Sequence, residues 1–218
     1  MIKAVNLCKS FSLDGFVVEA LKGVSFVIEK GSYTALMGPS GSGKTTLMNI
    51  IGCLDTPTSG QYELNGRVIS DLDEDQLSSI RNNEIGFIFQ SFNLMPRNTV
   101  LENVCLPLYY RKISNPISSA IVALSRVGLD HRGGHYPNQI SGGESQRVAI
   151  ARAIVTEPSI ILADEPTGNL DTATGDQIMG IFKELNELGA TVLLVTHDQE
   201  IATHASRILQ VRDGLLTG

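Results

Sequence analysis

A glycine-rich loop near residue 40 has the residue types and spacing of a phosphate-binding site. Its glycines would let backbone N–H groups turn towards phosphate oxygens, and the helix expected to follow adds its positive N-terminal end. Lys44 would reach the β- and γ-phosphates, and the Thr45 hydroxyl would bind Mg²⁺. The residues expected to hold a nucleoside triphosphate are Gly38, Pro39, Ser40, Gly41, Ser42, Gly43, Lys44, Thr45 and Thr46.

Two acids end a later apolar run and could activate water. Residues 160–163 predict a buried strand, and Asp164 and Glu165 follow it directly. Ligands of open α/β sheets bind beyond the ends of the strands. Asp164 could hold Mg²⁺, usually through its water shell. Glu165 could accept a proton from the water that attacks the γ-phosphate.

Polar residues end two other predicted strands in the same way. Gln90 follows residues 85–89 and could contact Mg²⁺ or the water, although an exposed glutamine is also common there. His197 follows the strand predicted for residues 191–195 and could contact the γ-phosphate, although a histidine after a strand is often structural.

A second glycine motif lies at residues 140–147, Ile-Ser-Gly-Gly-Glu-Ser-Gln-Arg. Ser141 and Glu144 have the spacing of a capping box, so a well-capped helix explains part of the pattern. Gly142 and Gly143 weaken the first turn by about 1 kcal/mol each, which a cap alone does not require. Bare N–H groups at a positive helix end instead favour a second phosphate contact.

Apolar strands that alternate with helices indicate an α/β fold with a mainly parallel sheet covered on both faces. Asn65-Gly66 predicts a hairpin between residues 61–64 and 67–69. Other strands are predicted at 2–7, 24–28, 33–37 and 207–211, and a loop between the first two. Helices are predicted at 44–52, 99–106, 116–127, 142–156, 176–188 and 199–205. The chain thus divides into a core of residues 1–90 and 157–218 and a helical insert of residues 91–156.

Composition argues against a nucleic-acid binder. The 218 residues carry a net charge of −6, and the basic residues form no cluster longer than Arg111-Lys112. The three cysteines have no metal-ligand spacing and are expected to be buried thiols. No apolar run approaches the roughly 18–20 residues that span a bilayer, so another polypeptide is expected to supply any membrane-spanning part.

Taken in order, these motifs resemble the nucleotide-binding domain of ABC transporters along nearly the whole chain. Residues 38–45 resemble the Walker A motif, Gln90 the Q-loop and residues 141–146 the signature motif. Residues 160–165 resemble Walker B, residues 169–171 the D-loop, and His197 the switch histidine.

The resemblance implies what spacing alone does not show. The fold would be an ABC ATPase: a P-loop NTPase core, an antiparallel β subdomain and an inserted α-helical subdomain. Two copies would face head to tail, with each ATP and its Mg²⁺ between Walker A of one and the signature of the other. Ser141, Gly142, Gly143, Glu144 and Asp171 would act in trans, and Phe11 would stack on adenine. Thr45, Gln90 and Asp164 would be the metal ligands.

Details such as residues 49–54, 92–96 and 102–108 resemble the branch that contains the exporter MacB, the lipoprotein-release ATPase LolD and the division protein FtsE. This implies a separate permease, and a location on the cytoplasmic face of the inner or plasma membrane. Glu144 stands where glutamine is commoner. A regulatory ATPase like FtsE is one alternative, and a soluble ABC ATPase of DNA repair or translation is another. The sequence identifies neither the permease nor the cargo.

Overall fold

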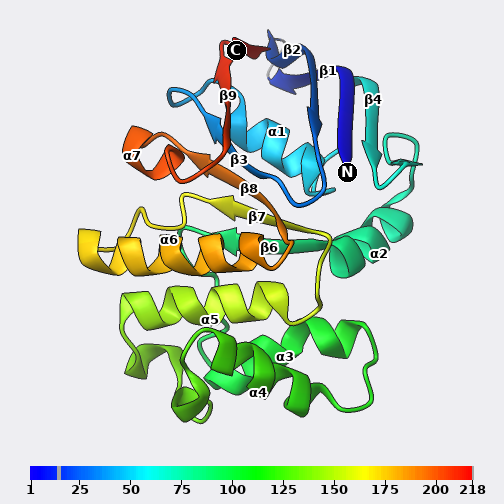
Figure 1. Ribbon diagram of the computed structural model, residues 1–218. Helices are drawn as coiled ribbons and strands as arrows, with labels where there is room; N and C mark the ends of the chain where they lie inside the picture. Colours follow the sequence, from blue (N-terminus) through cyan, green and yellow to red (C-terminus); the bar gives the residue numbers. More distant parts are fainter. Residues whose placement is uncertain (14–15, 218) are drawn as a thin grey trace. The chain divides into compact units, whose positions relative to one another are not determined.

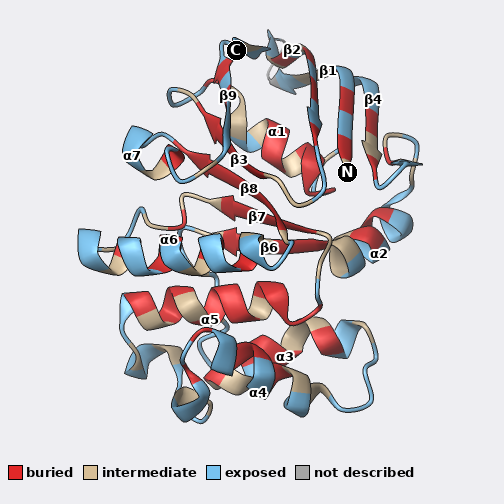
Figure 2. Ribbon diagram, in the orientation of Figure 1, coloured by how far each residue is buried: buried red, intermediate tan, exposed pale blue. Residues whose placement is uncertain are grey.

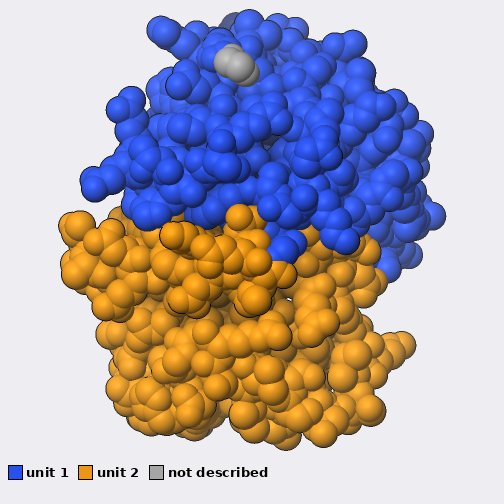
Figure 3. All heavy atoms as spheres, in the orientation of Figure 1, with its two compact units in different colours: residues 1–81, 189–218 blue, residues 82–188 orange. Residues whose placement is uncertain are grey.

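The computed structural model describes residues 1–13 and 16–217, and these form two compact units (Figure 3). Unit 1 comprises residues 1–81 and 189–218, and unit 2 comprises residues 82–188. The predicted division at residues 90 and 157 follows secondary structure and stays a prediction.

An antiparallel sheet forms one part of unit 1 (Figure 1). Its strands are β1 (Ile2–Leu13), β2 (Phe16–Ile28), β4 (Ser59–Leu64) and β5 (Arg67–Val68), in the order β2-β1-β4-β5. The predicted hairpin is present, and its turn residues Asn65 and Gly66 have φ angles of 52° and 78°. The loop predicted between residues 7 and 24 is wrong, because β1 and β2 continue past Leu7 with shifts in register.

Parallel strands form the other part of unit 1. Every residue of β3 (Tyr33–Met37) and of β8 (Thr191–Thr196) is buried, as expected for strands covered on both faces (Figure 2). β3 pairs in parallel with β8 and with β9 (Arg207–Arg212), and β10 (Leu215–Leu216) pairs antiparallel with β9. α1 (Lys44–Ile51) follows β3, and α7 (Gln199–Ala202) follows β8.

Unit 2 combines a parallel strand pair with helices. β6 (Ile85–Phe89) pairs with β7 (Ile160–Asp164). The helices α3 (Val100–Tyr110), α4 (Pro116–Arg126) and α5 (Gly142–Ile154) pack on one another, and α6 (Thr172–Glu187) packs on α5 (Figure 1). Two short 3₁₀ turns, η1 (Asp130–Arg132) and η2 (Pro137–Gln139), lead into α5.

Several helices differ from the prediction: α3 ends four residues after predicted residue 106, and α7 ends three residues before predicted residue 205. α2 (Glu74–Glu84) was not predicted, because only Leu77 and Ile80 are buried and its polar sequence carries little periodicity. α6 begins four residues before predicted residue 176, since Asp171 caps it. Of the helices that the described ranges contain, none combines the length and the apolar character needed to cross a bilayer.

Candidate ATP-binding site

The phosphate loop of unit 1 joins the buried strand β3 to α1. Gly43 is the residue before α1 and has a φ of 106°, and a Cβ there would lie 2.5 Å from the Ala20 carbonyl oxygen. Only glycine therefore fits this left-handed, closely packed position. The Lys44 ammonium donates to the carbonyls of Gly38 at 2.8 Å and Pro39 at 2.9 Å, so the loop holds its own cation over its first residues.

The other residues of the phosphate loop differ in how far they are exposed to solvent. Pro39, Ser40, Gly41 and Thr45 are exposed, and Thr46 is half-buried. Ser42 is 2% exposed and its backbone N–H donates to the Pro39 carbonyl at 3.3 Å, so this residue is packed within the loop.

His197 lies beside this loop within unit 1. Met37 and Thr196 are paired residues at the ends of β3 and β8, so the chain enters the loop and the His197 turn from neighbouring positions. Asp198 fixes the turn, because its N–H donates to the Thr196 hydroxyl at 3.1 Å and its carboxylate accepts from the Glu200 N–H at 2.8 Å. The exposed imidazole is thus carried on a well-anchored turn.

Phe11 lies on the antiparallel sheet of unit 1 and is 38% exposed. The Lys9 ammonium lies 5.0 Å from the centre of its ring, a cation–π contact. Lys9 is itself held by the Asp55 carboxylate at 2.6 Å and by the Thr56 carbonyl at 2.8 Å. Since the ammonium covers one face of the ring, a stacked base would use the other.

In unit 2 the two polar strand ends lie side by side. Phe89 pairs with Asp164, so Gln90 and Glu165 leave β6 and β7 from adjacent positions. Asn169 joins the two loops: its amide nitrogen donates to the Gln90 carbonyl at 2.9 Å, and its amide oxygen accepts from the Gln90 side chain at 3.3 Å. Gln90 is therefore held against the segment that follows Glu165.

Glu165 lies in a strained turn at the end of β7. Its φ of 46° is a left-handed conformation that a non-glycine residue keeps only where neighbouring contacts enforce it. The Gly168 N–H donates to the Glu165 carbonyl at 3.0 Å. On the other side, the buried Gln146 of α5 donates its amide N–H to the Pro166 carbonyl at 2.7 Å. These bonds hold the turn and so fix the direction of the acid.

The signature residues form a complete capping box at the start of α5. The Ser141 hydroxyl accepts from the Glu144 N–H at 3.1 Å, and the Glu144 carboxylate accepts from the Ser141 N–H at 2.8 Å. The pKa of Glu144 is lowered, first by that backbone N–H and then by Arg132. Because the box uses the N–H groups of Ser141 and Glu144, those of Gly142 and Gly143 are left for an anion.

Asp171 lies behind this helix tip. Its carboxylate accepts from the Thr174 N–H at 3.0 Å and from the Thr174 hydroxyl at 2.7 Å, which caps α6 and lowers the pKa of Asp171. A Cβ on Gly143 would lie 2.4 Å from the Thr174 Cγ2, so glycine is needed for the tip to pack on this side chain. The signature tip and the D-loop are thus joined within unit 2.

The donor atoms suit Mg²⁺, which prefers oxygen ligands and commonly takes one or two carboxylates together with substrate phosphates. The half-buried Asp164 supplies a carboxylate, and the Thr45 hydroxyl comes from the first turn of α1. The amide nitrogen of Gln90 is bonded to Asn169, so the amide oxygen is the atom of this side chain that could bind a metal. Thr45 belongs to unit 1 and the other two residues belong to unit 2.

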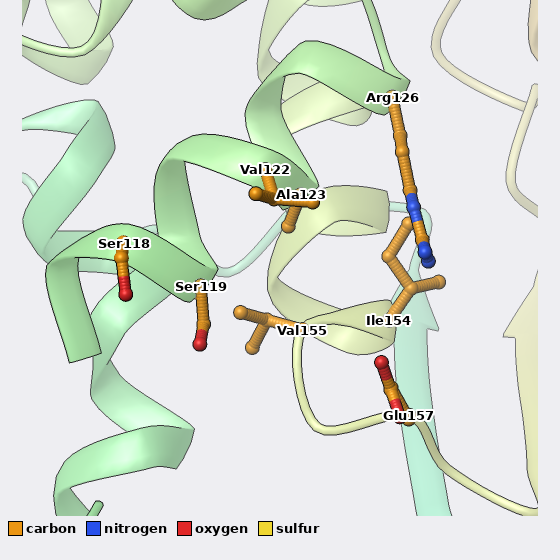
Figure 4. A pocket seen from close by; sticks show the side chains of 8 residues that line it. All are labelled: Ser118, Ser119, Val122, Ala123, Arg126, Ile154, Val155 and Glu157. Atoms are coloured by element: carbon orange, nitrogen blue, oxygen red, sulfur yellow. The ribbon is translucent and has the colours of Figure 1, made fainter. Parts of the chain in front are cut away.

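A separate hollow of about 210 Å³ in unit 2 contains none of these residues (Figure 4). Side chains of α4, the end of α5 and the segment that follows it line the hollow: Ser118, Ser119, Val122, Ala123, Arg126, Ile154, Val155 and Glu157. It is therefore distinct from the predicted nucleotide residues.

Sequence reasoning missed two positioning side chains, Gln146 and Arg132. Gln146 lies among the buried residues of α5. A polar residue at a core-facing position of a helix is the signal in the sequence that could have identified it. Arg132 lies in the short turn η1, and its Nε donates to Glu144 at 2.8 Å. Nothing in the sequence pattern indicates that contact.

Comparison with known sequences agrees with these features. The family described as "ABC transporter" matches residues 21–168. The chain is 50% identical over 216 residues to the uncharacterized ABC transporter ATP-binding protein YknY of Bacillus subtilis, and covers 94% of that protein. It is 49% identical over 216 residues to the macrolide export ATP-binding/permease protein MacB of Bdellovibrio bacteriovorus. The chain spans 33% of the length of that MacB protein.

Solved structures agree as well. The dimeric structure of MJ0796, described as a bacterial ABC transporter cassette, has a TM-score of 0.92 and 46% identity, and the match covers 100% of this chain and 97% of that one. A post-hydrolysis dimer of the same cassette bound to ADP and Pi matches with a TM-score of 0.92 and 45% identity. These similarities confirm the predicted ABC ATPase fold, and the chain therefore belongs to the ABC transporter family as an ATP-hydrolysing cassette.

Proposed function

We propose that this chain binds MgATP in its phosphate loop, pairs head to tail with a second copy, and hydrolyses the two ATP molecules between them. The observation that carries the proposal is the signature tip of α5. Its capping box leaves the N–H groups of Gly142 and Gly143 for an anion, while the phosphate loop supplies Lys44 on a different unit. A second phosphate-binding helix end fits an ATP molecule shared between two copies. The similar MJ0796 cassette was solved as a dimer, which supports the pairing.

In the proposed reaction, Glu165 accepts a proton from the water that attacks the γ-phosphate. The turn held by Gln146 and Gly168 fixes the position of this carboxylate, so little reorganisation is needed during the reaction. Lys44 and the Gly142 and Gly143 N–H groups stabilise phosphate charge, and His197 orients the water. Thr45, Asp164 and Gln90 would hold Mg²⁺, which would neutralise charge on the phosphate oxygens.

Several groups are needed because no single one is strong enough. Stabilising the transition-state charge in related hydrolases is worth about 10³–10⁵ in rate, or roughly 4–7 kcal/mol. One helix end contributes at most about 2 kcal/mol. The remaining stabilisation is assigned to the metal, Lys44, His197 and Glu165.

The ATP-driven closure of the dimer is proposed to drive a membrane permease of the MacB or LolD type. The name of the MacB relative joins ATP-binding and permease parts, and this chain corresponds to a third of it. The proposal places the chain at the cytoplasmic face of the membrane, held there by the permease.

The test uses Glu165→Gln, with Glu187→Gln as the matched control on the exposed end of α6. Glu165→Gln should keep ATP affinity, lose at least about 100-fold in turnover and accumulate an ATP-dependent dimer in sedimentation velocity. Glu187→Gln should behave as the unmodified chain. Ser141→Arg should bind ATP as a monomer yet show neither dimer nor turnover. Full turnover in Glu165→Gln removes that residue from its role, and turnover in Ser141→Arg removes the head-to-tail arrangement.

A further inference from the structure

Glu144 places a carboxylate at a helix tip that is proposed to receive a polyanion. Both its oxygens act within unit 2: one accepts the Ser141 N–H at 2.8 Å, and the other accepts Nε of Arg132 at 2.8 Å. The carboxylate helps to form the tip through the capping box. Its negative charge, however, opposes the phosphates of ATP, because like charges a few ångströms apart repel.

Arg132 is built to offset that charge. The exposed fractions of the two side chains are 33% for Arg132 and 15% for Glu144, so water screens their ion pair only in part. A second contact also orients the guanidinium, since its Nη1 lies 3.3 Å from Nε2 of His135.

The turn that carries Arg132 is anchored to α3. The Val100 N–H donates to the His135 carbonyl at 2.7 Å, and the Leu101 N–H donates to the Gly133 carbonyl at 3.0 Å. The Arg132 N–H donates to the Leu129 carbonyl at 3.0 Å. Its position is therefore set by the helical part of unit 2, and it reaches α5 through Glu144.

We propose that Arg132 is a positioning residue for ATP-dependent pairing: it neutralises Glu144, so that the signature tip keeps its cap and still accepts the phosphates of the ATP held by the other copy. This inference rests on the proposed head-to-tail function. It predicts that Arg132 matters because residue 144 is acidic, and that glutamine at 144 makes it dispensable.

The experiment is a double-mutant cycle in the hydrolysis-deficient Glu165→Gln background. The dissociation constant of the MgATP-dependent dimer is measured by sedimentation velocity with Arg132→Ala, with Glu144→Gln and with both. Arg132→Ala should weaken pairing about tenfold, equivalent to about 1.4 kcal/mol. In the presence of Glu144→Gln, the same change should weaken pairing less than about twofold. Arg126→Ala, which removes a positive charge from an exposed position of α4, is the control for net charge.

Two further measurements separate charge from packing. Arg132→Gln keeps a hydrogen-bond donor but no charge and should be as weak as Arg132→Ala, whereas Arg132→Lys should restore pairing. The defect should also shrink between about 0.1 M and about 1 M salt, where the Debye length falls from about 10 Å to about 3 Å. Because loss of the ion pair with Glu144 would also lower the stability of unit 2, thermal melts of each variant show which part of a defect is a loss of folding.

The outcomes separate the two proposals. If the Glu165→Gln chain itself does not pair on MgATP, the proposed function fails. If it pairs and Arg132→Ala pairs equally well, the inference about Arg132 fails alone. If Arg132→Ala weakens pairing equally whether residue 144 is glutamic acid or glutamine, Arg132 has a structural role and charge compensation is overturned.

Discussion

Replacing Gln146 by leucine should separate catalysis from stability. The amide of Gln146 lies fully buried in α5 and makes one bond that reaches the reacting region, to the Pro166 carbonyl at 2.7 Å. Pro166 follows Glu165, whose left-handed turn depends on such contacts. Leucine has nearly the same size, so the packing of α5 should survive while the bond to the turn is lost.

The expected magnitudes follow from the hydrogen bonds on each side. Gln146→Leu leaves the Pro166 carbonyl without this donor, which costs about 1–3 kcal/mol. It also removes the buried Gln146 Oε1, which has no hydrogen-bond partner among the described residues. The two effects offset each other, so the free energy of unfolding should change by no more than about 1 kcal/mol, or about 2–4 °C in Tm. If the misplacement of Glu165 raises the activation barrier by the same 1–3 kcal/mol, kcat should fall about 5- to 150-fold.

Tyr62→Phe is the matched control in unit 1. The Tyr62 hydroxyl is a buried donor to a single buried carbonyl, that of Ile51 at 2.7 Å. Removing it leaves that carbonyl with only the long contact from the Cys53 thiol at 4.0 Å and brings no compensating gain, so stability should fall by about 1–3 kcal/mol while kcat stays near that of the unmodified chain. Steady-state ATPase assays and thermal melts on both variants give the comparison. Unchanged kcat in Gln146→Leu, with ATP affinity intact, would refute the role assigned to Gln146.

Two further results are expected. Lys44→Ala should weaken ATP binding about 10- to 150-fold in calorimetry, since a charged hydrogen bond to phosphate is worth about 1.5–3 kcal/mol, and unchanged affinity would contradict the phosphate-loop assignment. Because the pKa of Glu144 is lowered in the folded state, mainly by the Ser141 N–H, its charge stabilises the fold above its unfolded pKa of about 4.3. That stabilisation is lost as the pH falls, so the unmodified chain should lose more stability than Glu144→Gln between about pH 5 and pH 3. Parallel losses in denaturant titrations would rule this out.

The sequence predicted the elements whose burial is continuous. The strand over residues 33–37 is an unbroken apolar run because both its faces are covered, and the glycine loop that follows it is fixed by local geometry at Gly43. Strand ends could be predicted too, so Gln90 and His197 were placed correctly at the ends of β6 and β8. In each case the pattern lies within a few residues of the feature that it predicts.

Features that depend on distant contacts escaped prediction. α6 begins at Thr172 rather than at predicted residue 176, because the Asp171 cap starts it before Gly175, a residue type that weakens a helical pattern. The long hairpin of β1 and β2 carries polar residues and register shifts that disguise its alternation. Arg132 meets Glu144 only after the helical segment has folded, and no local spacing encodes that pair.

One helix bears on both halves of the proposed reaction. The tip of α5 at Ser141 is proposed to take the ATP of the other copy, and Gln146 lies five residues further on, a rise of about 7.5 Å along the axis. Gln146 holds the turn of Glu165, the acid proposed to act on the chain's own ATP. A helix that served only to fill the core would carry an apolar residue at position 146, as it does at Val148 and Ile150. The amide instead links the helix whose tip is proposed to contact one nucleotide to the turn of the acid proposed to cleave the other, so a buried hydrogen bond joins the two proposed groups.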